Sequence, residues 1–244
     1  MALIIDYILH LGDNALIQGH RNSEWCGHGP VLEQDIAITN ISLDLIGQAR
    51  NFYQLAASMK ADGSTEDTFA YLRNPDDFKN FIITELPKGD WALTILPQFF
   101  FSNYQNLLYR ELENHTNPDL AAIAAKALKE VTYHLRWSSE WVIRLGDGTE
   151  ESHRRLKDAL QLLWPYTGEF FASDKYDAIS KINRTELQNS WMKKTKEIFS
   201  EALIEVPADF HSAFNGDHEK HTTHLEELLT EMQFLQRTYP GAEW

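Results

Sequence analysis

The fold is decided by residues 129–145, which read KEVTYHLRWSSEWVIRL. Apolar residues recur here at steps of three and four, the periodicity of an amphipathic helix. A second row beside them should also be largely buried, yet it carries Glu130 and His134 one turn apart. Proteins that bind two irons inside a four-helix bundle place a His three residues after a Glu. Tyr133 occupies that position here, so such a site is either altered or lost.

Composition narrows the class of protein. The chain has 244 residues, 43% of them hydrophobic, enough for a sizeable core. Its net charge of −14 argues against nucleic acid or an anionic membrane surface as a main partner. No apolar stretch approaches the ~20 residues that a membrane helix needs. Cys26 is the only cysteine, so no intrachain disulfide can form, and we expect a cytoplasmic protein.

Helical patterns follow one another along almost the whole chain, and no alternating strand pattern interrupts them. We expect Ser64 and Asn117 to be N-caps, with Pro118 in the first turn after Asn117. The sequence therefore predicts an all-α fold and a single domain over residues 1–244. The predicted helices cover residues 3–25, 31–59, 64–73, 90–113, 117–145, 149–171, 184–203 and 217–239.

The carboxylates needed for two irons are incomplete. The second predicted helix offers Asp44, but the residue three positions later is Gly47, which cannot bind a metal. The helix at residues 90–113 has no carboxylate from Trp91 to Arg110. Iron at its higher oxidation states needs hard carboxylate ligands as well as imidazole. We therefore expect no metal site and no catalytic residue in this chain.

The remaining polar residues on the predicted buried faces need another explanation. Buried polar groups must find hydrogen-bond partners or cost about 1–3 kcal/mol each. We expect five such residues to form a buried polar network in place of a metal: Asp13, Asp44, Gln48, Glu130 and His134. The alternative is a di-iron oxidase active on its own, whose atypical ligands would be Glu24, Asp44, Glu130 and His134.

Three histidines, His218, His221 and His224, recur at three-residue steps near a predicted helix start. Asp217 as N-cap, followed by Glu219 in the first turn, explains the segment as an ordinary helix entry. We interpret the histidines as a solvated helix face. The alternative is that this cluster binds divalent metal ions adventitiously.

Three segments carry a resemblance to a known family. The most specific covers residues 12–53 and reads GDNALIQGHRNSEWCGHGPVLEQDIAITNISLDLIGQARNFY. The other two are KEVTYHLRWSSEWVIRLGDGTEES at residues 129–152 and LLTEMQFLQRTYPGAEW at residues 228–244. Together they resemble the non-catalytic C subunits of bacterial ring 1,2-phenylacetyl-CoA epoxidases, also called phenylacetate-CoA oxygenases. The resemblance runs over nearly the whole chain.

This resemblance implies a ferritin-like up-down bundle with additional helices. It implies a structural subunit of a multicomponent monooxygenase that epoxidises phenylacetyl-CoA in phenylacetate catabolism. The catalytic A subunit would be the main partner, and other oxygenase subunits and a second copy of the chain further ones. Di-iron, dioxygen and NADPH-derived electrons would be used by the partner subunits, with no cofactor in this chain.

Overall fold

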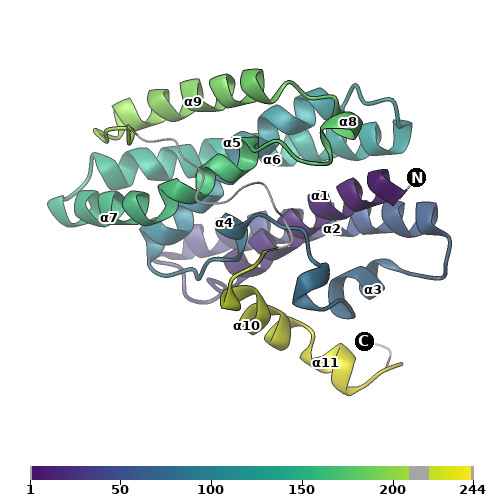
Figure 1. The fold of residues 1–244 in the computed structure, drawn as a ribbon. Helices are drawn as coiled ribbons and strands as arrows, with labels where there is room; N and C mark the ends of the chain where they lie inside the picture. The colour runs from purple at the N-terminus through teal and green to yellow at the C-terminus, as the bar shows by residue number, and fades with distance from the viewer. Residues whose placement is uncertain (1, 209–219, 243–244) are drawn as a thin grey trace. The chain divides into compact units, whose positions relative to one another are not determined.

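The computed structural model describes residues 2–208 and 220–242, and every regular element in these two ranges is a helix (Figure 1). The all-α prediction is therefore confirmed. Contacts divide the chain into two compact units. The split unit consists of Met1–Pro87 and Asp217–Trp244, and the continuous unit of Lys88–Gly216. Division by contacts does not test whether the units fold apart, so one domain over residues 1–244 stays a prediction.

The split unit is built on a pair of long helices, α1 and α2, that pack antiparallel along each other (Figure 1). Short helices in the connection after α2, together with two helices from the end of the chain, complete the unit. Its elements are α1 (Ala2–Ser23), α2 (Leu32–Lys60), α3 (Glu66–Tyr71), the 3-10 turn η1 (Pro75–Asp77), α4 (Ile82–Glu85), α10 (Thr223–Met232) and α11 (Phe234–Thr238).

Two glycines let α1 approach α2 closely. A Cβ atom added at Gly12 would lie 2.7 Å from the ring of Tyr53, which is closer than real Cβ contacts allow. A Cβ atom at Gly19 would lie 3.2 Å from the Cβ of Leu45. Because residues seven apart lie on the same face of a helix, both glycines face α2.

The continuous unit has its own pair of long helices, α5 and α6, which also run antiparallel. The ring of Trp91 at the start of α5 meets Trp141 near the end of α6, with ring centroids 5.4 Å apart. The unit's elements are α5 (Trp91–Leu112), α6 (Pro118–Gly146), α7 (Glu150–Thr167), η2 (Gly168–Phe171), α8 (Asp177–Ser180) and α9 (Arg184–Glu201). Each unit thus supplies one pair of long helices, as a ferritin-like fold requires.

Aromatic rings fill the core of the continuous unit. Phe100 on α5 lies 5.5 Å from Trp191 on α9 and 5.9 Å from Trp164 on α7, measured between ring centroids. Trp191 is fully buried, and its indole Nε1 donates a hydrogen bond to the carbonyl of Phe100 at 3.0 Å. Rings of this size contribute much of the buried apolar area of a core, and their polar edges need partners.

Several predicted boundaries are confirmed and others are wrong. Asn117 caps α6 through hydrogen bonds to two backbone amides, as predicted. Ser64 is not the cap of α3, because Thr65 caps it in a reciprocal pair with Thr68. The predicted helix 217–239 begins only at Thr223 and is divided into α10 and α11. Asp217, His218 and Glu219 lie outside the described residues.

Candidate functional site

Asp13 in the middle of α1 is fully buried, and both of its carboxylate oxygens accept hydrogen bonds. The hydroxyl of Tyr53 donates to Oδ1 at 2.6 Å, and the backbone amide of Lys79 donates to Oδ2 at 2.9 Å. The Arg73 guanidinium makes a forked pair with the carboxylate, in which Nη1 lies 3.0 Å from Oδ2. Such a bidentate pair is among the strongest hydrogen-bonded arrangements in proteins. The charge of Asp13 is therefore neutralised by an arginine.

Aromatic rings enclose the Arg73 side of this pair. The guanidinium lies 4.2 Å from the ring centroid of Phe78 and 5.5 Å from that of Tyr53, within range of cation–π attraction. Burial lowers the pKa of Arg73, but the charge and hydrogen bond of Asp13, together with the other acidic groups nearby, outweigh burial, so the pKa is raised. Burial and the nearby Asp13 raise the pKa of Tyr53 well above its usual range. The cluster is thus a charged pair with a neutral phenol.

The partners of Asp13 were missed by sequence reasoning. Arg73 lies 60 residues further along the chain, in the connection between α3 and η1. One signal was available, because Arg73 is the only basic residue between Lys60 and Lys79 in an otherwise acidic segment. A single basic residue in an acidic segment is a candidate partner for a buried acid. Because Arg73 and Asp13 are far apart in the sequence, the sequence does not indicate that these two residues pair.

The other four residues of the predicted polar network are divided between the units. Gln48 on α2 is buried and Asp44 is half-buried, both in the split unit. His134 on α6 is fully buried and Glu130 is half-buried, both in the continuous unit. Asp13 has the partners given above. The network as a whole spans both units and stays a prediction.

A di-iron centre does not fit the donors that the structure describes. The buried polar positions of α5 carry amides and hydroxyls, which are uncharged. Gln98 Nε2 donates to Ser102 Oγ at 2.7 Å, and Asn103 Nδ2 donates to the Trp191 carbonyl at 3.0 Å. Iron in such bundles needs a carboxylate from each long helix. Within residues 2–208 and 220–242, no group of three or more His, Cys, Asp and Glu side chains could hold a metal ion.

Glu24, a member of the alternative ligand set, lies just beyond α1 and pairs with Arg21 at 2.7 Å. Arg21 also donates to the backbone carbonyls of Glu85 and His224. Its guanidinium therefore joins α1 to α4 and α10 inside the split unit. By pairing with Arg21, Glu24 helps to hold this guanidinium in place.

The interpretation of the histidine cluster as a solvated face is wrong for His221. Its side chain is only 5% exposed and contacts Glu85, which is fully buried at the end of α4. His224, in contrast, is half-exposed and pairs with Glu227 on its own helix. The sequence suggested a helix entry, but α10 begins after His221, which leaves that side chain free to turn inward.

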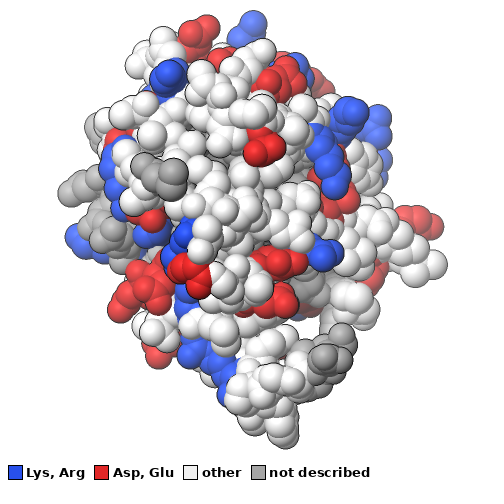
Figure 2. Space-filling view, turned by 90° about the vertical axis from the view of Figure 1, so that its right-hand side faces the viewer, with Lys and Arg blue, Asp and Glu red and all other residues white. Residues whose placement is uncertain are grey.

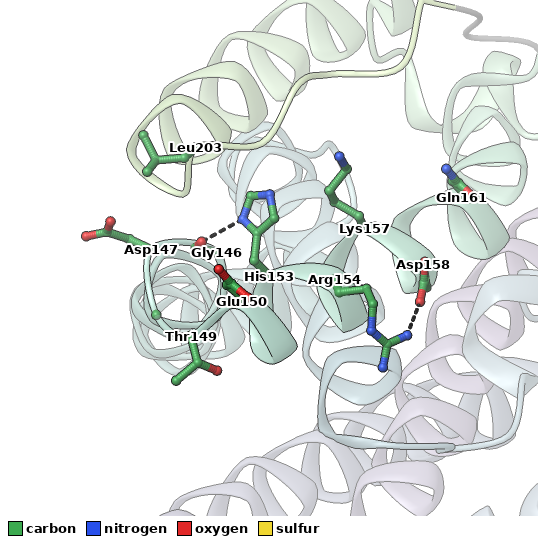
Figure 3. Close-up of a pocket in the computed structure, with 11 residues that line it drawn as sticks. Gly146, Asp147, Thr149, Glu150, His153, Arg154, Lys157, Asp158, Gln161 and Leu203 are labelled. Carbon is green, nitrogen blue, oxygen red and sulfur yellow. Dashed lines mark hydrogen bonds and ion pairs between the residues drawn. The ribbon is translucent and has the colours of Figure 1, made fainter.

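A cavity of about 570 Å³ lies where α6 ends and α7 begins (Figure 3). His153 is fixed at its edge, because Nδ1 donates to the carbonyl of Gly146 at 2.7 Å. Arg154 points toward Asp158 and pairs with it at 2.9 Å. The lining also includes Lys157, together with two further carboxylates from Asp147 and Glu150. These mixed charges favour neither an anionic nor a cationic ligand.

The described surface is also mixed in charge where Figure 2 draws it. Lys and Arg side chains alternate with Asp and Glu on that face, and uncharged residues separate them. A nucleic-acid interface would instead gather positive charge along one stripe or patch. Within the described ranges, none of the helices has the length and apolar character to cross a bilayer.

Comparison with known proteins agrees with the resemblance stated above. The sequence matches the family described as Phenylacetic acid catabolic protein over residues 2–244. It is 42% identical over 243 residues to the C subunit of the 1,2-phenylacetyl-CoA epoxidase of Escherichia coli (strain K12), and the alignment covers 98% of both chains. The chain therefore belongs to the Phenylacetic acid catabolic protein family.

Proposed function

We propose that this chain is the structural subunit of a multicomponent di-iron monooxygenase that epoxidises phenylacetyl-CoA in phenylacetate catabolism. Its role is to support the catalytic A subunit. The observation that carries the proposal is the 42% identity to the C subunit of such an epoxidase over 98% of both chains. An alignment without large gaps at either end favours the same place in the same kind of complex.

The chemistry of the split unit supports a non-catalytic role. Asp13, a buried carboxylate in the middle of α1, is neutralised by Arg73. The Arg73 guanidinium occupies the position beside this carboxylate in which a metal ion would lie if Asp13 were an iron ligand. We infer that di-iron, dioxygen and NADPH-derived electrons are used by the partner subunits and that this chain holds no cofactor.

We infer the partners and the cellular location of the chain as well. The A subunit is the principal partner, further oxygenase subunits join the complex, and the chain pairs with a second copy of itself when alone. Exposed apolar side chains on α2, including Leu32, Ile36 and Leu43, support a surface that association covers. The single cysteine, Cys26, is free and exposed, which suits a reducing cytoplasm.

Reconstitution tests the proposal. The A subunit is prepared with and without this chain, and phenylacetyl-CoA turnover is measured with the reductase and NADPH. We expect the A subunit alone to be less soluble or less active, and addition of this chain to restore turnover. An inert protein such as serum albumin at equal concentration is the control. Full turnover in the absence of this chain would remove the scaffold role, and a monodisperse monomer in light scattering would contradict self-pairing.

Iron loading separates the proposal from the alternative of an independent oxidase. After anaerobic incubation with ferrous iron and removal of excess metal, we expect iron far below one atom per chain. Metal analysis near two irons per chain, together with an oxo-bridge absorption band, would favour the alternative.

A further inference from the structure

Both ring nitrogens of His221 face hydrogen-bond acceptors. Nδ1 lies 2.8 Å from Oε2 of Glu85, and Nε2 lies 3.0 Å from the backbone carbonyl of Phe78. A carbonyl can only accept, and a neutral imidazole carries only one N–H group. With Glu85 ionised, both contacts are satisfied together only when the ring carries two protons.

The surroundings of Glu85 favour a carboxylate that pairs with a positively charged His221 ring. The backbone amide of Thr222 donates to Oε1 at 2.5 Å, and the side-chain amide of Asn80 donates to Oε2 at 3.0 Å. Donors of this kind favour the ionised carboxylate. The Glu85 side chain is fully buried, so its charge needs a partner of opposite sign. His221 supplies that partner.

We propose that His221 and Glu85 form a proton-dependent latch that fastens residues 220–242 to α4. With the ring doubly protonated the latch is closed. When the ring loses a proton, either the Glu85 carboxylate or the Phe78 carbonyl faces a nitrogen lone pair, and the contact opens. The latch is a property of the fold and does not depend on the proposed function.

The segment that the latch holds has further anchors, all of which are uncharged on the accepting side. Gln233 Nε2 donates to the carbonyls of Ala70 and Arg73, at 3.0 and 3.1 Å. Arg237 Nη2 donates to the Arg73 carbonyl at 2.7 Å. These bonds fasten the far end of the segment independently of pH. Opening of the latch therefore loosens the start of α10, which then keeps the bond from Arg21 to the His224 carbonyl.

The charged surroundings of His221 favour its protonated form. Burial lowers the pKa of His221. The hydrogen bond and charge of Glu85 on α4, the Phe78 carbonyl and the more distant Asp13 on α1 together outweigh burial, so the pKa is raised. Arg73 compensates Asp13, and Arg21 binds the backbone carbonyl of Glu85. On its own segment, Lys220 and His224 are the neighbouring basic residues.

The sign of the pH effect follows. A group whose pKa is higher in the folded state than in the unfolded state stabilises the folded state. This stabilisation is fully present below the unfolded-state pKa and is lost as pH rises through the folded-state pKa. The opening equilibrium should therefore rise by about tenfold per pH unit between pH ~6.5 and the raised pKa, and then level off.

Hydrogen exchange measured by mass spectrometry on the full chain tests this latch. Exchange of α10 peptides is followed from pH 6 to pH 9 and corrected for intrinsic base catalysis with an unstructured peptide. We expect the corrected rate in α10 to rise with pH while that in α5 stays level. An α10 rate that stays level as well overturns the proposal.

Two variants and one spectroscopic measurement sharpen the test. His221→Gln keeps a donor but cannot titrate, so α10 exchange should be pH-independent and faster than the wild type at pH 6. His224→Gln, three residues away and half-exposed, should leave the wild-type pH response intact. NMR titration of the wild-type His221 ring should give a pKa above the usual value. A ring that is neutral from pH 6 upward overturns the latch even if the variants fail to fold.

Discussion

The two units solve the problem of a polar core differently. In the split unit, full charges are buried as pairs, Asp13 with Arg73 and Glu85 with His221. In the continuous unit, the core around α5 is a cluster of aromatic rings, and the buried polar side chains of α5 itself are uncharged, such as Gln98 and Asn103. Such an uncharged region depends on packing and on neutral hydrogen bonds. A core of ion pairs also depends on every partner being present and correctly protonated.

This contrast teaches where each unit is vulnerable. Breaking one member of a buried ion pair leaves the other as an uncompensated charge, which is among the most costly single changes known. Removing part of an aromatic side chain leaves a cavity, whose cost depends on how far the neighbours collapse.

The largest effect is expected for Arg73→Ala in the split unit. Removal of the guanidinium strands the buried carboxylate of Asp13 and should cost about 3–5 kcal/mol of unfolding free energy. Urea unfolding measures the total, and hydrogen exchange of α1 and α2 peptides locates it in the split unit. Arg154→Ala, which removes an exposed pair with Glu151 and Asp158, is the control and should leave the unfolding midpoint unchanged. Equal effects of the two variants would contradict the ion-pair core.

A smaller effect is expected for Trp191→Phe in the continuous unit. The change removes the hydrogen bond to the Phe100 carbonyl and part of a fully buried ring, at a cost of about 2 kcal/mol. Because no charge is involved, the loss in unfolding free energy should be the same at pH 6 and pH 8. A loss that varies with pH would show that the aromatic core is coupled to a titrating group.

The smallest effect is expected from a pair of glycine changes in the split unit. Gly12→Ala adds a Cβ 2.7 Å from the Tyr53 ring, so overpacking should outweigh the gain in helix propensity and destabilise by about 1 kcal/mol. Gly47→Ala is the matched change on α2, where no described atom outside the adjacent residues and the local helix backbone lies within 4 Å of the new Cβ. It should stabilise by about 0.5–1 kcal/mol. Thermal unfolding of both variants measures the difference, and a shift of the same sign for both would contradict the close packing of α1 on α2.

What the sequence predicted well was local. Helix periodicity and the capping of α6 by Asn117 depend on neighbours within a few residues, so they could be derived from short segments. The choice between Ser64 and Thr65 as cap failed because both residues have the right chemistry and only backbone geometry separates them. Resemblance identified the family because it used the whole chain at once.

What the sequence could not predict was pairing across long separations. Asp13 was correctly singled out as a buried acid, but its partner Arg73 lies in a connection with no periodic pattern. His221 was misread because its neighbours look like a helix entry, and nothing nearby in the sequence indicates Glu85, 136 residues earlier. Charges in a core are decided by tertiary contacts, which local patterns do not encode.

Because the split unit is built from two separate parts of the sequence, it cannot be completed until both parts have been synthesised. Its anchors for α10 and α11, Glu85 and the backbone near Arg73, emerge from the ribosome long before His221, Gln233 and Arg237 are synthesised. The continuous unit, in contrast, is translated in one uninterrupted run. Because long-range contacts form slowly and domains fold as units during synthesis, we expect the continuous unit to mature first. The α1–α2 pair, although synthesised earlier, would then be completed only after α10 and α11 have been made.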